Sequence, residues 1–226
     1  MPKTCRDRSN PFEEYSQSEF KSRYRLSKET VLYLVHLTSS YLGFASKRNN
    51  FVPPLLQVTV ALRFYATGHF QRSDGDLIGL SQATVCRIVR RVSEAICQLR
   101  EILITFPNED GLQTIKQIFC SQSRIPGVIG CIDCSHIPII SPGGEDAELF
   151  RNRKGFFSIN VQAICDQWLC FINIVCRWPG SAHDSRIFDN SGTCSKLENK
   201  LINGILLGDS GYPCRSYLLT PVYKPS

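Results

Sequence analysis

The chain has 226 residues, of which 42% are hydrophobic, and its formal net charge is +6. This length and composition are enough to bury the core of one large domain or of two small ones. The charge is unevenly placed, because residues 1–126 hold 17 Lys and Arg against 11 Asp and Glu, whereas residues 127–226 hold nine of each. We therefore expect a polyanion to be attracted to the N-terminal half.

The composition of the chain predicts neither a secretory signal nor a membrane span. Residues 1–19 form a polar tail with no apolar run after the first residues. No stretch approaches the ~18 consecutive apolar residues of a membrane helix, so we expect no membrane partner. The 11 cysteines are an odd number, scattered and mostly set in apolar runs. This favours reduced, buried thiols over a disulfide framework at Cys86, Cys97, Cys165, Cys170 and Cys176.

Helical spacing of apolar residues dominates residues 20–126, which we interpret as a helical, DNA-binding region. Ser27 stands as an N-cap before a first helix. Pro53 and Pro54 predict the first turn of a second helix, and Gly68 predicts its end.

A helix-turn-helix pattern follows this second helix. A short helix from about residue 74 leads to a turn at Gly79 and an N-cap at Ser81. The next helix has one apolar face, formed by Val85, Ile88, Val89, Val92 and Ile96. Its solvent side carries three basic residues that would enter a DNA major groove: Arg87, Arg90 and Arg91. Taken alone, the segment is more simply explained as a helical hairpin with a solvated basic face.

After residue 126 the pattern changes to short apolar strands. Asp166-Gln167 predicts a hairpin between two of them, and a helical or loop crossover extends to about Lys200. Three strands, a crossover and a further buried strand are typical of an RNase H-like mixed sheet, so residues 127–226 predict an α/β core. The expected strands are residues 128–133, 137–140, 159–165, 169–175, 205–209 and 217–222.

Two aspartates lie in apolar strands, where an unpaired carboxylate is costly. Asp133 lies within the first strand, and Asp209 ends the strand at 205–209. On adjacent strands they would bind Mg²⁺ or Mn²⁺, hard cations that prefer oxygen ligands. Two such ions support phosphodiester hydrolysis without a nucleophilic side chain. Taken alone, each aspartate is more simply explained as a residue that caps a turn at a strand end.

Asp184 and two histidines complete the set of candidate site residues. Asp184 is either a third metal ligand or the N-cap of a crossover helix, with His183 as a neighbouring histidine. His136, three residues after Asp133, is either an outer partner of the metal site or phosphate contact, or an ordinary strand histidine. A Ser/His/Asp hydrolase is poorly supported, because no Gly-x-Ser-x-Gly turn follows any strand.

A series of short motifs across residues 20–226 resembles the PIF/Harbinger transposases. The motifs are residues 20–27, 75–81, 85–87, 130–137, 152–162, 178–185 and 206–212. The resemblance implies a DDE-type nuclease that requires a divalent metal, with Asp133 and Asp209 catalytic and Asp184 as a further metal ligand. It also implies DNA contacts at Arg87, Arg90, Arg91, Arg153 and Lys154, while the positions of His136 and His183 make them the expected outer partners of the site.

The same resemblance implies a Myb/SANT-like DNA-binding partner and a location in nucleus and cytoplasm. The chain departs from the pattern of this family in two places. Cys134-Ser135 stands where the family has Gly-Thr, and no glutamate follows Glu198 to supply the family's third acid. We therefore expect a C-terminally truncated RNase H-like core with impaired activity. The alternative is a non-catalytic DNA- or protein-binding module derived from a transposase.

Overall fold

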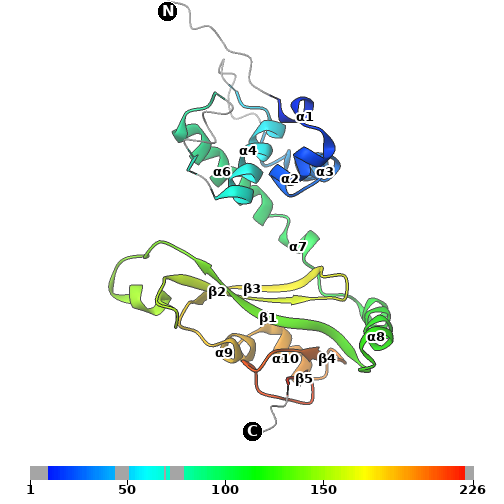
Figure 1. Ribbon diagram of the computed structural model, residues 1–226. Helices are drawn as coiled ribbons and strands as arrows, with labels where there is room; N and C mark the ends of the chain where they lie inside the picture. The colour runs from blue at the N-terminus through cyan, green and yellow to red at the C-terminus, as the bar shows by residue number, and fades with distance from the viewer. Residues whose placement is uncertain (1–9, 44–50, 69, 72–78, 222–226) are drawn as a thin grey trace, which may run out of the picture. The chain divides into compact units, whose positions relative to one another are not determined.

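The computed structural model describes residues 10–43, 51–68, 70–71 and 79–221 (Figure 1). The chain divides into two compact units, Met1–Leu103 and Ile104–Ser226. The sequence had placed this boundary near residue 126. The structure places it earlier, because helix α8 (Glu109–Ser123) packs on the first strand of the second unit through Ile115 and Phe119.

Helices make up the regular structure of the described part of the first unit. They are α1 (Pro11–Glu14), α2 (Gln17–Tyr24), α3 (Lys28–Thr38), α4 (Pro54–Thr67), α6 (Gln82–Cys97) and α7 (Arg100–Leu103). Two of them begin in the segment predicted as a polar tail. The prediction was wrong for residues 10–19, because their polar side chains cap helices: Asn10 caps α1, and Ser16 forms a capping box with Glu19 at α2.

The predicted signals for helix ends are confirmed in α3 and α4. The Ser27 side chain accepts a hydrogen bond from the Thr30 amide at the start of α3. Pro54 is the first residue of α4, and Gly68 ends that helix at φ 62°, in the left-handed region that favours glycine. The helices enclose one apolar cluster, which includes Phe20, Val31, Val58, Val85 and Val92.

Helix α6 matches the sequence pattern closely. Ser81 accepts a hydrogen bond from the Thr84 amide and caps the helix, and the predicted apolar face is buried except at Ile96, which is half-buried. The arginines at positions 87, 90 and 91 are exposed. The short helix expected before Gly79 falls on residues 72–78, which lie outside the described residues.

The second unit is built on a five-stranded mixed sheet with the strand order β3-β2-β1-β4-β5. Strands β1 and β2 are antiparallel, as are β2 and β3, whereas β4 runs parallel to both β1 and β5. The two strands expected at 128–133 and 137–140 are a single strand. The bounds are β1 (Val128–Pro138), β2 (Ser158–Cys165), β3 (Phe171–Pro179), β4 (Ile205–Leu207) and β5 (Leu218–Leu219).

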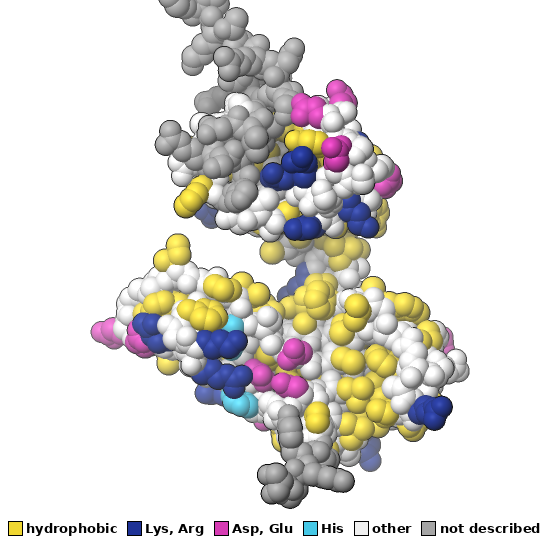
Figure 2. All heavy atoms as spheres, in the orientation of Figure 1, with side chains coloured by type: hydrophobic (Ala, Val, Ile, Leu, Met, Phe, Trp, Pro, Cys, Tyr) yellow, Lys and Arg dark blue, Asp and Glu magenta, His cyan; other side chains and the backbone are white. Residues whose placement is uncertain are grey.

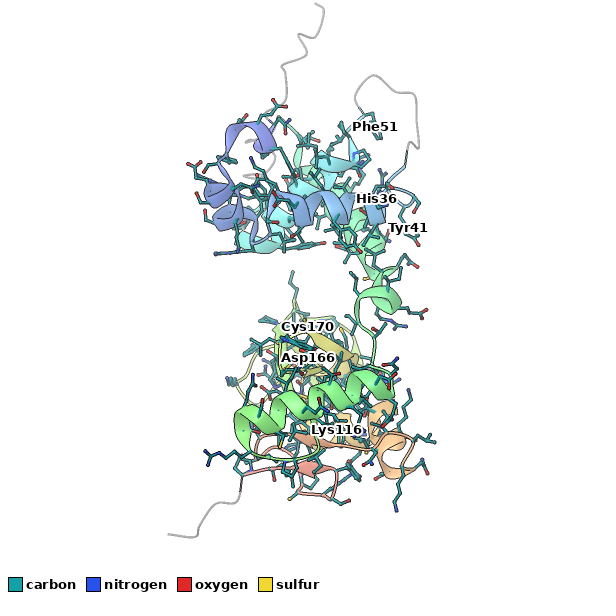
Figure 3. The ribbon with its side chains drawn as sticks, turned by 90° about the vertical axis from the view of Figure 1, so that its right-hand side faces the viewer. His36, Tyr41, Phe51, Lys116, Asp166 and Cys170 are labelled. Atoms are coloured by element: carbon teal, nitrogen blue, oxygen red, sulfur yellow. The ribbon has the colours of Figure 1, made fainter. Side chains whose placement is uncertain are left out.

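The turn between β2 and β3 is longer than the predicted Asp166-Gln167 hairpin. The Asp166 carboxylate accepts hydrogen bonds from the amides of Trp168 and Cys170, each at 2.9 Å. This side chain therefore holds residues 166–170 as the turn, with Leu169 at φ 63°. Figure 3 labels Asp166 and Cys170 at this end of the sheet.

Helices cover the two faces of the sheet around β1. Side chains of successive strand residues point to opposite faces. Cys131 packs in one cluster with Ile115 and Phe119 of α8, whereas Ile132 packs in the other cluster with Phe188. That second face is covered by α9 (Asp184–Asp189) and α10 (Gly192–Glu198), and the 3₁₀ helix η1 (Glu145–Phe150) precedes β2.

Within the described ranges, every cysteine is free, in agreement with the sequence analysis. Their predicted burial was wrong in most cases. Cys86, Cys97, Cys170 and Cys176 are exposed and Cys165 is half-buried, because they lie on the outward sides of α6 and of the sheet hairpin. In the same part of the chain, no helix has both the length and the apolar content that a membrane crossing requires.

Candidate carboxylate site

Strand pairing brings together the two segments that carry Asp133 and Asp209. Cys131 of β1 pairs with Leu207 of the parallel strand β4. Asp133 follows two residues later in the middle of β1, and Asp209 lies two residues beyond the end of β4. Both side chains are exposed. Figure 2 shows acidic side chains gathered on this unit, with basic and histidine side chains next to them.

The carboxylates of Asp184 and Asp209 both lie near Gly211. A Cβ atom added at Gly211 would lie 2.9 Å from Asp209 Oδ1 and 3.1 Å from Asp184 Oδ2. The two carboxylate oxygens therefore cannot be farther apart than the sum of these distances. The Gly211 amide donates to Asp209 Oδ1 at 2.9 Å, which fixes that carboxylate in the turn after β4. A side chain at position 211 would fill the space between the two acids.

The other oxygen of Asp184 is held by the sheet. Asn160 Nδ2 on β2 donates to Asp184 Oδ1 at 2.9 Å, and it also donates to the Ala182 carbonyl oxygen at 2.9 Å. The charge of Asp184 also raises the pKa of the Cys134 thiol on β1. Asp184 is thus held by a residue of β2, although it begins a helix.

Cys134 and Tyr212 stay protonated next to these carboxylates. The Cys134 Sγ atom lies 3.2 Å from the Tyr212 hydroxyl oxygen. Burial, together with the negative charges of Asp184 and Asp133, raises the pKa of Cys134 to about 12. Burial also raises the pKa of Tyr212, with smaller contributions from Cys134 and the same two aspartates. At neutral pH both groups are therefore neutral hydrogen-bond donors.

His136 joins the sheet to a basic turn. Its Nδ1 atom lies 3.1 Å from Ser158 Oγ, which also accepts a hydrogen bond from Asn152 at 3.0 Å. The Asn152 side chain accepts from the Lys154 amide at 2.9 Å and so shapes the turn. Arg153 and Lys154 are exposed at this turn. The predicted DNA contacts at 153 and 154 and the predicted outer partner at 136 are therefore linked by one hydrogen-bond network.

His183, and not Asp184, is the N-cap residue of helix α9. Its Nδ1 atom accepts from the Ser185 amide at 3.4 Å. Asp184 is the first residue of the helix, so its carboxylate is available to the site. The interpretation of Asp184 as an N-cap is therefore wrong, because the histidine ring caps the helix instead.

Of the three aspartates, Asp184 and Asp209 have carboxylate oxygens near one glycine, and Asp133 lies on strand β1. In the part of the chain that the structure describes, no group of three or more His, Cys, Asp or Glu side chains is placed to hold a metal ion. Asp133 and Cys134 point to opposite faces of β1, as neighbours in a strand do. Mg²⁺ is often bound by one or two carboxylates, with water and substrate phosphates as its other ligands. The facing oxygens of Asp184 and Asp209 fit that donor set.

The basic residues of α6 form a second candidate surface, in the first unit. Arg90 Nε pairs with Glu94 Oε1 at 2.9 Å, and Arg87 Nε donates to the Ala83 carbonyl oxygen at 3.1 Å. These contacts hold two guanidinium groups along the helix. Arg87, Arg90 and Arg91 together form one exposed basic surface of the helix.

Sequence reasoning missed three residues of the carboxylate site: Asn160, Tyr212 and the thiol of Cys134. A signal for Asn160 was present. Ser158, Asn160 and Gln162 alternate with apolar residues in β2, and all three are fully buried. Polar residues on the buried face of a strand indicate a hydrogen-bond network. Tyr212 offered no comparable signal, because its role depends on the turn after β4.

Comparison with known proteins places these features in a family. The family model described as "DDE superfamily endonuclease" matches residues 132–226, which include all three aspartates. The HARBI1 proteins of Rattus norvegicus and Homo sapiens, named as candidate nucleases, are each 36% identical over 206 residues. These alignments cover 90% of this chain and 59% of each relative. No solved structure matches the chain.

A plant relative extends the comparison. Antagonist of Like Heterochromatin Protein 1 of Arabidopsis thaliana is 27% identical over 222 residues, which cover 89% of this chain and 56% of that protein. The chain thus spans somewhat more than half the length of each of these relatives. The resemblance to Harbinger transposase-derived nucleases predicted from the motifs is confirmed by these similarities, and residues 132–226 match the DDE superfamily endonuclease family.

Proposed function

We propose that the second unit is the core of a transposase-derived DNA endonuclease that requires a divalent metal. The convergence of Asp184 and Asp209 across Gly211, beside Asp133 on the neighbouring strand, carries this proposal. Asp133 and Asp209 would hold Mg²⁺ or Mn²⁺, and Asp184 would supply a further ligand through Oδ2, the oxygen that does not accept the Asn160 hydrogen bond. The bound ion would activate the attacking oxygen and stabilise the leaving oxygen of a phosphodiester.

The chain's own side chains would prepare the site for this reaction. The Gly211 amide and Asn160 orient two carboxylates, and Cys134 and Tyr212 remain neutral beside them. Arg153 and Lys154 would contact DNA phosphates at the turn that Asn152 shapes. Phosphate contacts of this kind position DNA without reading its sequence.

The sheet and the helices support a more specific description of the fold. We propose that the mixed sheet is RNase H-like, because its order β3-β2-β1-β4-β5 combines an antiparallel three-strand meander with two parallel strands. We also propose that α6 is the recognition helix of a helix-turn-helix. Its capped start and its exposed arginines support this role.

A second candidate is a DNA- or protein-binding module without catalysis. The described residues contain no three-residue metal group, and α6 exposes a basic surface in the other unit. In either case we propose DNA as the ligand, a Myb/SANT-like protein as the partner, and action in the nucleus and cytoplasm.

The test is nicking of supercoiled plasmid with Mn²⁺. We expect nicking only with the metal, with residues 1–226 less active than a longer version that supplies a third acid, and we expect Asp133→Asn and Asp209→Asn to abolish nicking. Glu198→Gln is the matched control, because Glu198 is a carboxylate of the same unit that bonds Tyr217 instead of the site. Because the relatives are longer, the assay is run on residues 1–226 and on a version extended to the relatives' full length.

Three results separate the two candidates. Nicking that depends on Mn²⁺ and on Asp209 supports the nuclease. Absence of nicking in both lengths, with no effect of Mn²⁺ on the melting temperature, contradicts it. If DNA binding is then kept in Asp133→Ala but lost when the three α6 arginines become Ala, the protein is a binding module without catalysis.

A further inference from the structure

Asn160 is a buried polar residue that forms hydrogen bonds with the segment at the start of α9. It lies on β2 with an exposed fraction of 0%. A buried amide is costly unless it is hydrogen-bonded. The Nδ2 group of Asn160 uses both hydrogens, donating to the Ala182 carbonyl oxygen and to Asp184 Oδ1. One side chain therefore joins strand β2 to the first residue of α9.

The two oxygens of Asp184 have different surroundings. Oδ1 accepts the Asn160 hydrogen bond, whereas Oδ2 faces the space at Gly211 where Asp209 Oδ1 also lies. A carboxylate group is planar, so fixing one oxygen fixes the direction of the other. The Asn160 bond therefore keeps Oδ2 of Asp184 directed toward Asp209.

We propose that Asn160 is the positioning residue of the carboxylate site. By holding Asp184 Oδ1, it keeps the opposite oxygen in place beside Asp209 and so sets the affinity of the pair for a divalent ion. This inference rests on the proposed metal-dependent function and adds to it a residue that does not touch the ion. Loss of such an outer partner typically weakens metal affinity by about 10–100-fold.

Gln162 provides a matched control on the same strand. It lies two residues after Asn160, so it points to the same face, and its exposed fraction is also 0%. Among the described residues, neither its Nε2 nor its Oε1 atom has a hydrogen-bond partner. Replacing Gln162 therefore removes a buried amide from β2 without releasing Asp184.

The experiment is calorimetric titration of Mn²⁺ into the 226-residue protein. We expect Asn160→Leu to weaken Mn²⁺ binding about tenfold or more. Gln162→Leu should leave the affinity within about twofold of the unaltered protein. The double variant Asn160→Leu with Asp184→Ala should bind no more weakly than Asp184→Ala alone, because a positioning residue acts only through its partner.

Each other outcome has a defined meaning. If Asn160→Leu binds Mn²⁺ normally, or weakens Asp184→Ala by a further tenfold, the positioning role is overturned while the metal site stands. If the unaltered protein binds no Mn²⁺, or Asp184→Ala and Asp209→Ala leave its affinity unchanged, the proposed function itself fails. Should Asn160→Leu not fold by tryptophan fluorescence, Asn160→Thr replaces it, since threonine suits a strand but is too short to reach Asp184.

Discussion

The two candidate surfaces of this protein are built in different ways. Helix α6 places its arginines on one exposed surface within a few consecutive residues, so helical spacing alone brings them together. The carboxylate site takes residues from β1, β2, α9 and the turn after β4. It therefore depends on strand register and on one glycine turn. The comparison predicts that the helix surface tolerates local change, whereas the carboxylate site is lost when the sheet core is disturbed.

The largest expected effect comes from the core behind the carboxylates. Phe188 on α9 is fully buried, with its ring edge-on to Tyr212 at 6.2 Å. We expect Phe188→Ala to lower the free energy of unfolding of the second unit by about 3–5 kcal/mol. Both tryptophans, Trp168 and Trp178, lie in this unit, so urea unfolding followed by tryptophan fluorescence measures it directly.

The matched control for Phe188 is Phe20, which is equally buried in the first unit and stacks on Tyr24 at 4.4 Å. Phe20→Ala should remove helical circular dichroism at lower urea and leave the tryptophan transition in place. If Phe20→Ala lowers the tryptophan transition as much as Phe188→Ala does, the two units do not unfold separately and the comparison fails.

A smaller effect is expected on DNA binding through α6. When Arg87, Arg90 and Arg91 all become Ala, each lost phosphate contact should reduce the salt dependence of binding by about one unit in the log–log slope. Because Arg90 already pairs with Glu94, we expect it to contribute less than the other two. Fluorescence anisotropy at several salt concentrations measures the slope.

Arg100→Ala is the control for this experiment, because Arg100 is exposed and lies outside α6. Asp133→Ala should also leave metal-free DNA binding intact, since the carboxylates repel phosphate in the absence of a cation. If the triple variant binds DNA with an unchanged salt slope, α6 is not part of the DNA-binding surface.

The smallest expected effect is a pH dependence of the first unit. Burial raises the pKa of Tyr24 to about 12. The unfolded chain ionises its tyrosines near pH 10, so the stability contributed by neutral Tyr24 is fully present below about pH 10 and is lost as the pH rises toward about 12. Tyr24→Phe should flatten this loss when helical circular dichroism is followed across that window. If Tyr24→Phe has the same pH profile as the unaltered protein, ionisation of Tyr24 does not cause this loss of stability.

Local patterns in the sequence predicted local structure well. Ser81 and the apolar face of α6 were confirmed, as were Pro54 and Gly68 at the ends of α4. The polar residues before Phe20 were misinterpreted, because capping residues and tail residues have the same composition. Helix α8 was assigned to the wrong unit, because its apolar face does not reveal which partner it packs against.

The site could be predicted only in part. Three aspartates in motif context were enough to indicate the family, and the comparisons confirmed it. The hydrogen bond of Asn160 to Asp184 and the contact across Gly211 could not be predicted, because each depends on register between distant segments. The N-cap role of His183 was missed for a simpler reason: histidine is an uncommon capping residue.

Metal-directed backbone cleavage tests the central claim most directly. Fe²⁺ bound in place of Mg²⁺, with ascorbate and peroxide, generates hydroxyl radicals that cut the chain near the ion. We predict cuts close to Asp133, Asp184 and Asp209, suppressed by excess Mg²⁺ and absent in Asp209→Ala. Cuts confined to other segments, or an unchanged pattern in Asp209→Ala, would contradict a metal site at these carboxylates.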